Sequence, residues 1–138
     1  MAETPVVKSA NASFDASTGM VGPQVSHRIL GVDCLSPVTP LTMHADGLLY
    51  PADGSAVGVN AVIFGWSTRA GKAGQTMTVY SAGDVAKYAD TTLVPGSILF
   101  LGTPAAGAAV LSSTASIGDT VGKAQAIDAD NIRIISFT

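Results

Sequence analysis

The chain has little charge, few aromatic residues and almost no cysteine. Only 12% of its 138 residues are charged, about half the share usual in soluble domains, so a monomer would expose much neutral surface. Such a composition suits a protein that packs against copies of itself or against a larger body. Aromatic residues make up 6% of the chain, so we expect a core of Val, Ile and Leu. The single cysteine, Cys34, excludes an internal disulfide.

Basic patches and apolar spanning runs are also missing. The seven basic residues are scattered singly and the net charge is −3, so nucleic acid is not an expected partner. The longest uncharged run, residues 91–118, contains two prolines and four glycines, which suits strands and loops rather than a membrane helix. The first residues lack the basic and apolar segments of a signal peptide. We therefore expect neither a membrane partner nor a targeting segment.

Short runs of alternating apolar and polar residues, separated by turn residues, recur along the chain, and no run has the period of a ten-residue amphipathic helix. The clearest hairpin lies within 39–58, where apolar residues flank Asp46-Gly47 and the glycine accepts the positive φ of a tight turn. We expect 85–88 to return antiparallel to 75–81. The predicted strands are 40–43, 48–50, 57–66, 75–81, 85–88, 97–101, 108–112, 123–127 and 132–137. This pattern predicts a mainly β, compact, barrel-like or β-clip-like domain.

Residues 1–22 differ from the rest, because Ser, Thr, Ala, Asn, Gly and Pro dominate and no period persists. We expect an extended N-terminal arm outside the core. Ordering such an arm costs roughly 20–45 kcal/mol, whereas burying its five apolar anchors returns about 8–15 kcal/mol. Backbone pairing with a partner strand would supply the missing contacts. We therefore divide the chain into an arm with the strand that follows it, 1–36, and a β domain, 37–138.

The chain offers little for catalysis or metal binding. Residues 65–73 fail the phosphate-loop pattern, because Trp66 replaces its first glycine and Ala73 its hydroxyl residue. Trp66 is instead expected to pack in the core or at an interface.

The few candidate metal ligands also have simpler explanations. The histidines, His27 and His44, with Cys34 between them lack the further ligand that a zinc site needs, so we expect edge or surface histidines and a small buried cysteine. The acidic stretch 128–131 lacks the glycine and distal glutamate of a calcium loop and is expected to form a hairpin turn. The residues of that turn that could bind calcium are Asp128, Asp130 and Asn131.

Two stretches resemble a known family. The first consists of 40–43, 48–50 and 56–59, and the second of 76–81, Gly83, Tyr88 and 93–95. In this order they resemble the head decoration (cement) proteins of lambda-like tailed bacteriophages. The resemblance covers 40–96 well and the C-terminal strand loosely, while the arm and 97–122 are longer than the family pattern.

The resemblance implies a virion protein without enzymatic activity or cofactor. A homotrimer on the outer surface of the expanded head would bind the major capsid protein through its arm, and many copies would stabilise the capsid against the pressure of packaged DNA. From this resemblance and the cost of ordering the arm, the candidate capsid contacts are Thr4, Pro5, Val6, Val7, Lys8 and Phe14.

The alternative is a head-fibre or lectin-like β module whose body binds host surface glycans. Exposed aromatic residues over a polar pocket would favour that function. The candidates are Tyr50, Trp66, Tyr80 and Tyr88. A small β enzyme is a third possibility, but it would need an acid–base constellation that the sequence does not show.

Overall fold

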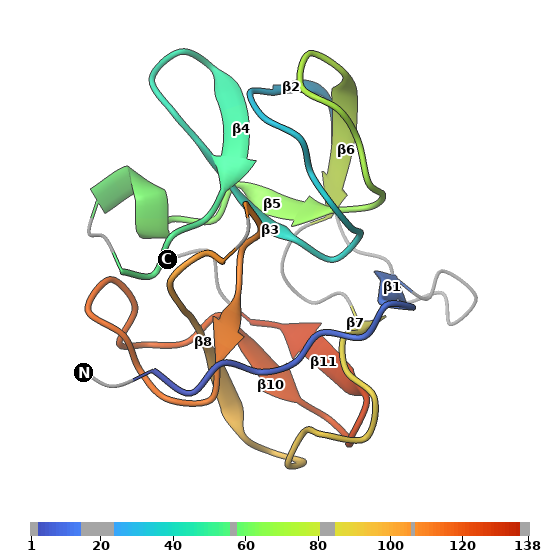
Figure 1. Ribbon diagram of the computed structural model, residues 1–138, viewed down its shortest axis with the longest axis vertical. Coiled ribbons are helices and arrows are strands. Elements are labelled where there is room, and N and C mark those ends of the chain that lie inside the picture. Colours follow the sequence, from blue (N-terminus) through green and yellow to red (C-terminus); the bar gives the residue numbers. More distant parts are fainter. Residues whose placement is uncertain (1–2, 15–23, 56–57, 81–84, 106, 136–138) are drawn as a thin grey trace.

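The structure is a computed structural model of the chain. It describes residues 3–14, 24–55, 58–80, 85–105 and 107–135, with the backbone alone at 24–27 and 58–59. Two β units lie one above the other in Figure 1. The upper unit is a small closed barrel in which β2 pairs in parallel with β4 and every other pair is antiparallel. Its strands, in order around the barrel, are β2 (Gln24–Leu30), β4 (Leu48–Pro51), β3 (Pro40–Met43), β5 (Gly65–Ser67) and β6 (Thr76–Tyr80).

The lower unit is a six-stranded antiparallel sheet. Its strands, in spatial order, are β1 (Ser13–Phe14), β7 (Val85–Lys87), β11 (Asn131–Ile134), β10 (Ala124–Ala126), β8 (Ile98–Leu101) and β9 (Leu111–Ser112). The prediction of a mainly β compact domain is therefore confirmed. Within the described residues, the only helix is the single 3-10 turn η2 (Gly58–Ala61), and no helix there has the length and apolarity to cross a membrane.

The hairpin predicted around Asp46-Gly47 is confirmed as β3–β4. Gly47 has a φ of +81° and donates its N–H to the carbonyl of His44 at 2.9 Å. The register pairs Thr42 with Tyr50. The alternation expected in β6 is also present, because Met77 and Val79 are buried while their neighbours are partly or fully exposed.

Two strand predictions are wrong. The apolar run 57–66 does not form one strand, since the chain makes the turn η2 before β5 begins at Gly65. Glycine and asparagine favour turns over strands, and the Asn60 carbonyl accepts the Asp53 N–H at 2.8 Å, which closes this loop. The segment 85–88 does not return onto β6 either, because β7 pairs with β1 and β11.

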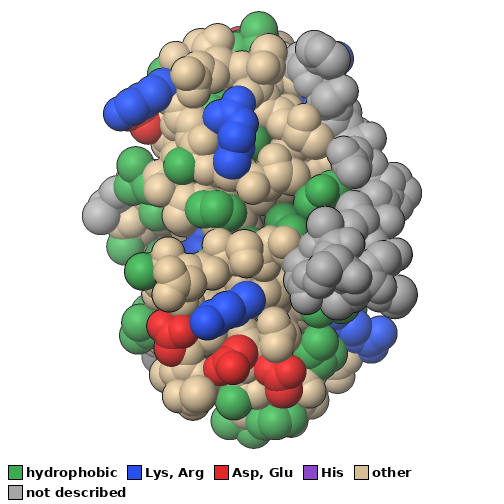
Figure 2. Space-filling model, turned by 90° about the vertical axis from the view of Figure 1, so that its right-hand side faces the viewer, with side chains coloured by type: hydrophobic (Ala, Val, Ile, Leu, Met, Phe, Trp, Pro, Cys, Tyr) green, Lys and Arg blue, Asp and Glu red, His purple; other side chains and the backbone are tan. Residues whose placement is uncertain are grey.

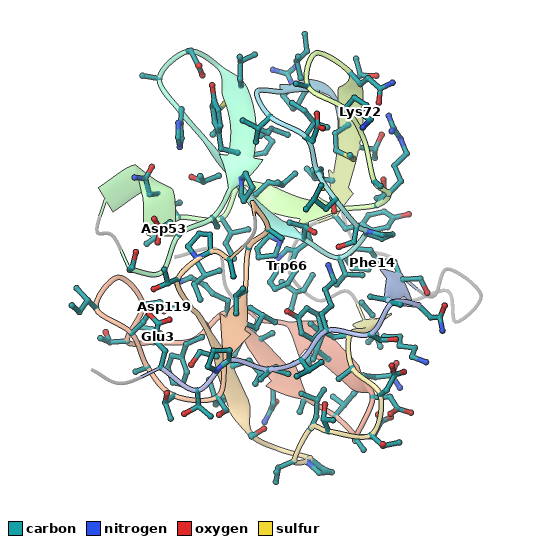
Figure 3. All side chains as sticks on the ribbon, in the orientation of Figure 1. Glu3, Phe14, Asp53, Trp66, Lys72 and Asp119 are labelled. Carbon is teal, nitrogen blue, oxygen red and sulfur yellow. The ribbon has the colours of Figure 1, made fainter. Side chains whose placement is uncertain are left out.

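The core has two parts. The smaller cluster fills the barrel, with Leu30, Leu41 and Met77 among its members, and contains Cys34, which is 3% exposed. The larger cluster joins barrel and sheet, and Trp66 of β5 is completely buried in it between the two units (Figure 3). The expected burial of Cys34 and Trp66 is thus confirmed.

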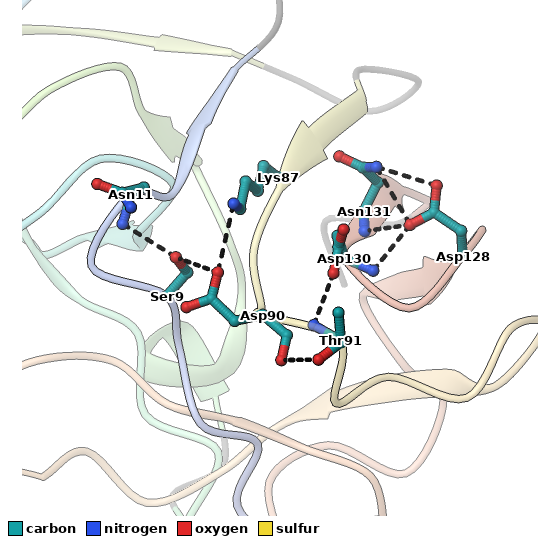
Figure 4. Close-up of polar contacts among 8 residues, drawn as sticks. All are labelled: Ser9, Asn11, Lys87, Asp90, Thr91, Asp128, Asp130 and Asn131. Atoms are coloured by element: carbon teal, nitrogen blue, oxygen red, sulfur yellow. Dashed lines mark hydrogen bonds and ion pairs between the residues drawn. The ribbon is translucent and has the colours of Figure 1, made fainter.

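The acidic stretch 128–131 forms the turn between β10 and β11, as predicted. Asp128 Oδ1 accepts the backbone N–H groups of Asp130 and Asn131, each at 2.8 Å, and the Asn131 amide also donates to both carboxylate oxygens (Figure 4). These bonds hold the pKa of Asp128 below its ordinary value. The carboxylate therefore stabilises a hairpin turn by accepting hydrogen bonds from the backbone of the same turn.

Candidate functional site

The described part of the N-terminal arm, residues 3–14, lies across the lower sheet and pairs with both of its edges (Figure 1). At the β9 edge, the Val6 N–H donates to the Leu111 carbonyl at 2.8 Å and the Thr4 carbonyl accepts the Ser113 N–H at 2.9 Å. At the opposite edge, β1 pairs with β7. The arm therefore forms a strap over the sheet.

Between these edges, Ser9 fastens the strap to the loop after β7. Its N–H donates to the Tyr88 carbonyl at 2.7 Å, and its hydroxyl donates to Asp90 Oδ1 at 3.0 Å. Lys87 forms an ion pair with the same carboxylate oxygen at 3.3 Å (Figure 4). The backbone pairing that the ordering argument required is present, but it is made with the arm's own chain.

The expectation that the arm stays outside the core is wrong for three of its residues. Ala12 is buried in the larger core, and Val6 and Phe14 pack against it. The Phe14 ring also meets the Tyr80 ring of the barrel edge-on, with centroids 4.7 Å apart. The physical reason is that the sheet presents two free edges and an apolar face, so the arm finds its partner strands within the same molecule.

Lys8 fixes the middle of the strap. Its ammonium donates to the Ser36 hydroxyl at 2.7 Å, to the Pro37 carbonyl at 2.5 Å and to the Thr39 hydroxyl at 3.2 Å. It also lies 5.7 Å from the centre of the Tyr88 ring. Burial lowers the pKa of Lys8 from 10.5 to about 8, although the Cys34 thiol acts in the opposite direction.

The lowered pKa makes stability depend on pH. The folded protein releases the Lys8 proton near pH 8 and the unfolded chain near pH 10.5, so the free energy of unfolding rises between these values. Across this window, the free energy of unfolding of wild type should rise by about 3 kcal/mol more than that of Lys8→Met. Urea unfolding at several pH values measures the difference. Lys72→Met, which removes a lysine whose side chain is 79% exposed, is the control. A constant difference between wild type and Lys8→Met would contradict the assignment.

Four of the six predicted contact residues lie together in one shallow groove. Thr4, Pro5, Val6 and Val7 line a hollow of about 250 Å³ against the loop 92–94. None of its lining residues is charged. Val7 is 75% exposed and Val94 is 70% exposed, so the rims of the groove are apolar. We call this hollow the arm groove.

The other two predicted contacts, Lys8 and Phe14, are not part of the arm groove. Lys8 forms hydrogen bonds within its own chain, and Phe14 packs against Tyr80 of the barrel. Sequence reasoning did not connect residues 92–94 with the arm. No signal in the sequence links the two segments, because they meet only through the fold of the sheet.

Charged side chains are sparse on one face of the molecule. Figure 2 shows one face on which basic and acidic side chains form small separate groups among uncharged ones. Within the described part of the chain, no three His, Cys, Asp or Glu side chains gather closely enough to hold a metal ion. His44 lies beside Tyr50, and the side chain of His27 lies outside the described residues. The arm groove, which no charged residue lines, is suited to contact by apolar side chains.

No family model, curated protein or solved structure matches the chain. The resemblance to phage head decoration proteins therefore rests on two sets of residues, 40–43, 48–50 and 56–59, and 76–81, Gly83, Tyr88 and 93–95.

Proposed function

We propose that the protein is a capsid decoration protein that binds the outside of a phage head as a homotrimer. The observation that carries the proposal is the arm groove, where four residues predicted as capsid contacts form one uncharged surface with two exposed valines on its rims. The resemblance stated above supplies the partner, the major capsid protein.

The strap arrangement changes how such a contact would work. Because residues 3–14 are already paired with their own sheet, the arm would not have to be ordered when the capsid binds. The groove is thus organised before binding, which lowers the entropic cost of association. Covering an exposed valine contributes about 1.5–2 kcal/mol, and repetition over many copies multiplies that small gain.

Co-sedimentation with empty heads of the parent virus, before and after expansion, tests the proposal. We expect saturable binding to expanded heads, near one copy per capsid subunit. Val7→Asp should weaken binding at least tenfold, because it buries an unpaired carboxylate in the contact while leaving the fold intact at a position that is 75% exposed. Ile117→Asp, at an apolar residue that is 66% exposed outside the arm groove, is the matched control.

Two results would contradict the proposal. If the protein binds neither form of the head, it is not a decoration protein. If Val7→Asp binds as well as wild type, the arm groove is not part of the capsid contact. Light scattering checks the oligomer separately. A trimer has about three times the 13.8 kDa mass of the chain, and a clean monomer at high concentration would exclude it.

A further inference from the structure

A different hollow lies on the barrel. A pocket of about 470 Å³ opens between the loop after β2, the β3–β4 hairpin, the residues Asp53 and Asn60, and the loop at Pro104 and Gly107. Its size falls within the range of roughly 300–1,000 Å³ that is typical of small-molecule sites. The arm groove shares none of its lining residues. We call it the barrel pocket.

One wall of the barrel pocket is a fixed pair of rings. The His44 and Tyr50 rings stack with centroids 4.0 Å apart and planes 20° from parallel. The Tyr50 hydroxyl donates to Asp46 Oδ2 at 2.7 Å. The ring lies directly on the backbone of Gly31, where an added Cβ would come within 2.4 Å of it. Rings held in place before a ligand arrives lose little freedom when it binds.

Beside the rings lie polar atoms with hydrogen-bonding capacity left over. Asp53 Oδ1 accepts both the N–H and the hydroxyl of Ser55, while Oδ2 has no partner among the described residues. Asn60 is half-buried, and its side-chain amide also has no hydrogen-bond partner among the described residues. The Asp53 N–H donates to the Asn60 carbonyl at 2.8 Å, which fixes the two residues next to each other.

A saccharide matches this combination of groups. The C–H face of a sugar ring packs against aromatic rings, while its hydroxyls both donate and accept hydrogen bonds. The Asp53 carboxylate only accepts and the Asn60 amide does both, so together they can satisfy adjacent hydroxyls. Val32 and Leu35, which are 40% and 57% exposed, give the pocket an apolar rim.

The charge of the pocket selects among saccharides. Asp33 and Asp53 line it, and Asp46 holds the Tyr50 ring. Lys72 forms an ion pair with Asp33 at 3.6 Å, so the nearby carboxylates outnumber this ammonium. An anionic ligand such as a nucleotide or a sialic acid would meet net repulsion. A proline-rich peptide would need successive ring-lined subsites, whereas this wall has a single stacked pair.

We propose that the barrel pocket binds a neutral saccharide, with its C–H face on the His44 ring, which Tyr50 backs, and its hydroxyls on Asp53 and Asn60. The inference goes beyond capsid decoration and does not depend on it. It uses a surface formed by other residues.

A titration of the full chain followed by amide NMR tests the inference. The probes are methyl glycosides of neutral hexoses and of N-acetylhexosamines at about 50 mM, more than tenfold above a millimolar dissociation constant. We expect saturable shifts of the amides at 31–35, 44–50, 52–53 and 60 with at least one neutral glycoside. We expect only weak shifts with sialic acid.

Variants distinguish binding in the barrel pocket from nonspecific binding elsewhere on the surface. His44→Ala and Asn60→Ala should each weaken binding about three- to tenfold, as expected for the loss of one ring contact or one hydrogen bond. Asn11→Ala, at an exposed asparagine of the strap, is the matched control and should bind like wild type. The inference is overturned by the absence of shifts with every neutral glycoside or by shifts confined to other surfaces. Tighter binding of sialic acid or of a proline-rich peptide, or unchanged binding of Asn60→Ala, would overturn it as well.

Discussion

Asp119→Ala is expected to lower the free energy of unfolding by about 3–5 kcal/mol, because it leaves the buried ammonium of Lys123 without its partner. The side chains of Asp119 and Lys123 are only 1% and 3% exposed, and Lys123 Nζ lies 3.0 Å from Asp119 Oδ1. The carboxylate also accepts the N–H groups of Leu101 at 2.8 Å and of Gly122 at 3.0 Å. It therefore ties the end of β8 to the loop that leads into β10 (Figure 3).

Lys123→Met is expected to cost less than Asp119→Ala. The carboxylate keeps three backbone donors when the ammonium is lost, whereas the ammonium keeps no carboxylate when Asp119 is lost. The double variant should lose less stability than the sum of the two single variants, because the second change removes the charge that the first left unpaired. Urea unfolding of the four proteins at neutral pH gives the coupling energy. Additive losses would show that the pair acts as two independent residues.

Acid should act on the same pair. Burial would raise the pKa of Asp119, but hydrogen bonds from Leu101, Gly122 and Lys123 outweigh it, so the pKa lies below its ordinary value of 3.8. A carboxylate whose folded pKa is depressed contributes stability that is present above the unfolded pKa and is lost as the pH falls through the folded pKa. Wild type should thus lose this contribution only below about pH 4, and Asp119→Asn should not show the loss.

Local features of the fold could be predicted from the sequence, because they are encoded by neighbouring residues. The Asp46-Gly47 turn, the alternation of β6 and the acidic turn 128–131 each depend on fewer than ten consecutive residues, and each is confirmed. Alternation along a strand shows which face is buried, but it does not show which strand lies beside it. For that reason the parallel β2–β4 pair and the pairing of β7 with β1 and β11 were not predicted.

The candidate sites were predictable to different extents for the same reason. The arm residues Thr4–Val7 stand out by composition, but the residues 92–94 that face them in the groove are far away in the sequence. The barrel pocket combines Tyr50, a named aromatic candidate, with polar atoms from Asp53 and Asn60, and the strand predicted at 57–66 placed Asn60 wrongly. The turn η2 brings the Asn60 backbone to Asp53, and turn geometry of this kind depends on tertiary contacts.

Trp66→Ala is expected to destabilise the barrel and the sheet together, by about 3–5 kcal/mol. Trp66 is completely buried, and its register in β5 places it between Pro40 of β3 and Tyr80 of β6. Its core cluster includes Leu99 and Ile132 of the sheet, so the indole fills the space between the two units. Removing it leaves a cavity that both units line.

Trp66→Phe is the matched variant and should cost clearly less than Trp66→Ala. It keeps a ring in the core, and it removes an indole N–H that is buried without a hydrogen-bond partner among the described residues. Because Trp66 is the only tryptophan, unfolding of both variants is followed by far-UV circular dichroism. Amide hydrogen exchange then locates the loss. Equal loss of protection in β6 and β10 indicates one cooperative unit, whereas faster exchange in β6 alone would show that barrel and sheet unfold separately.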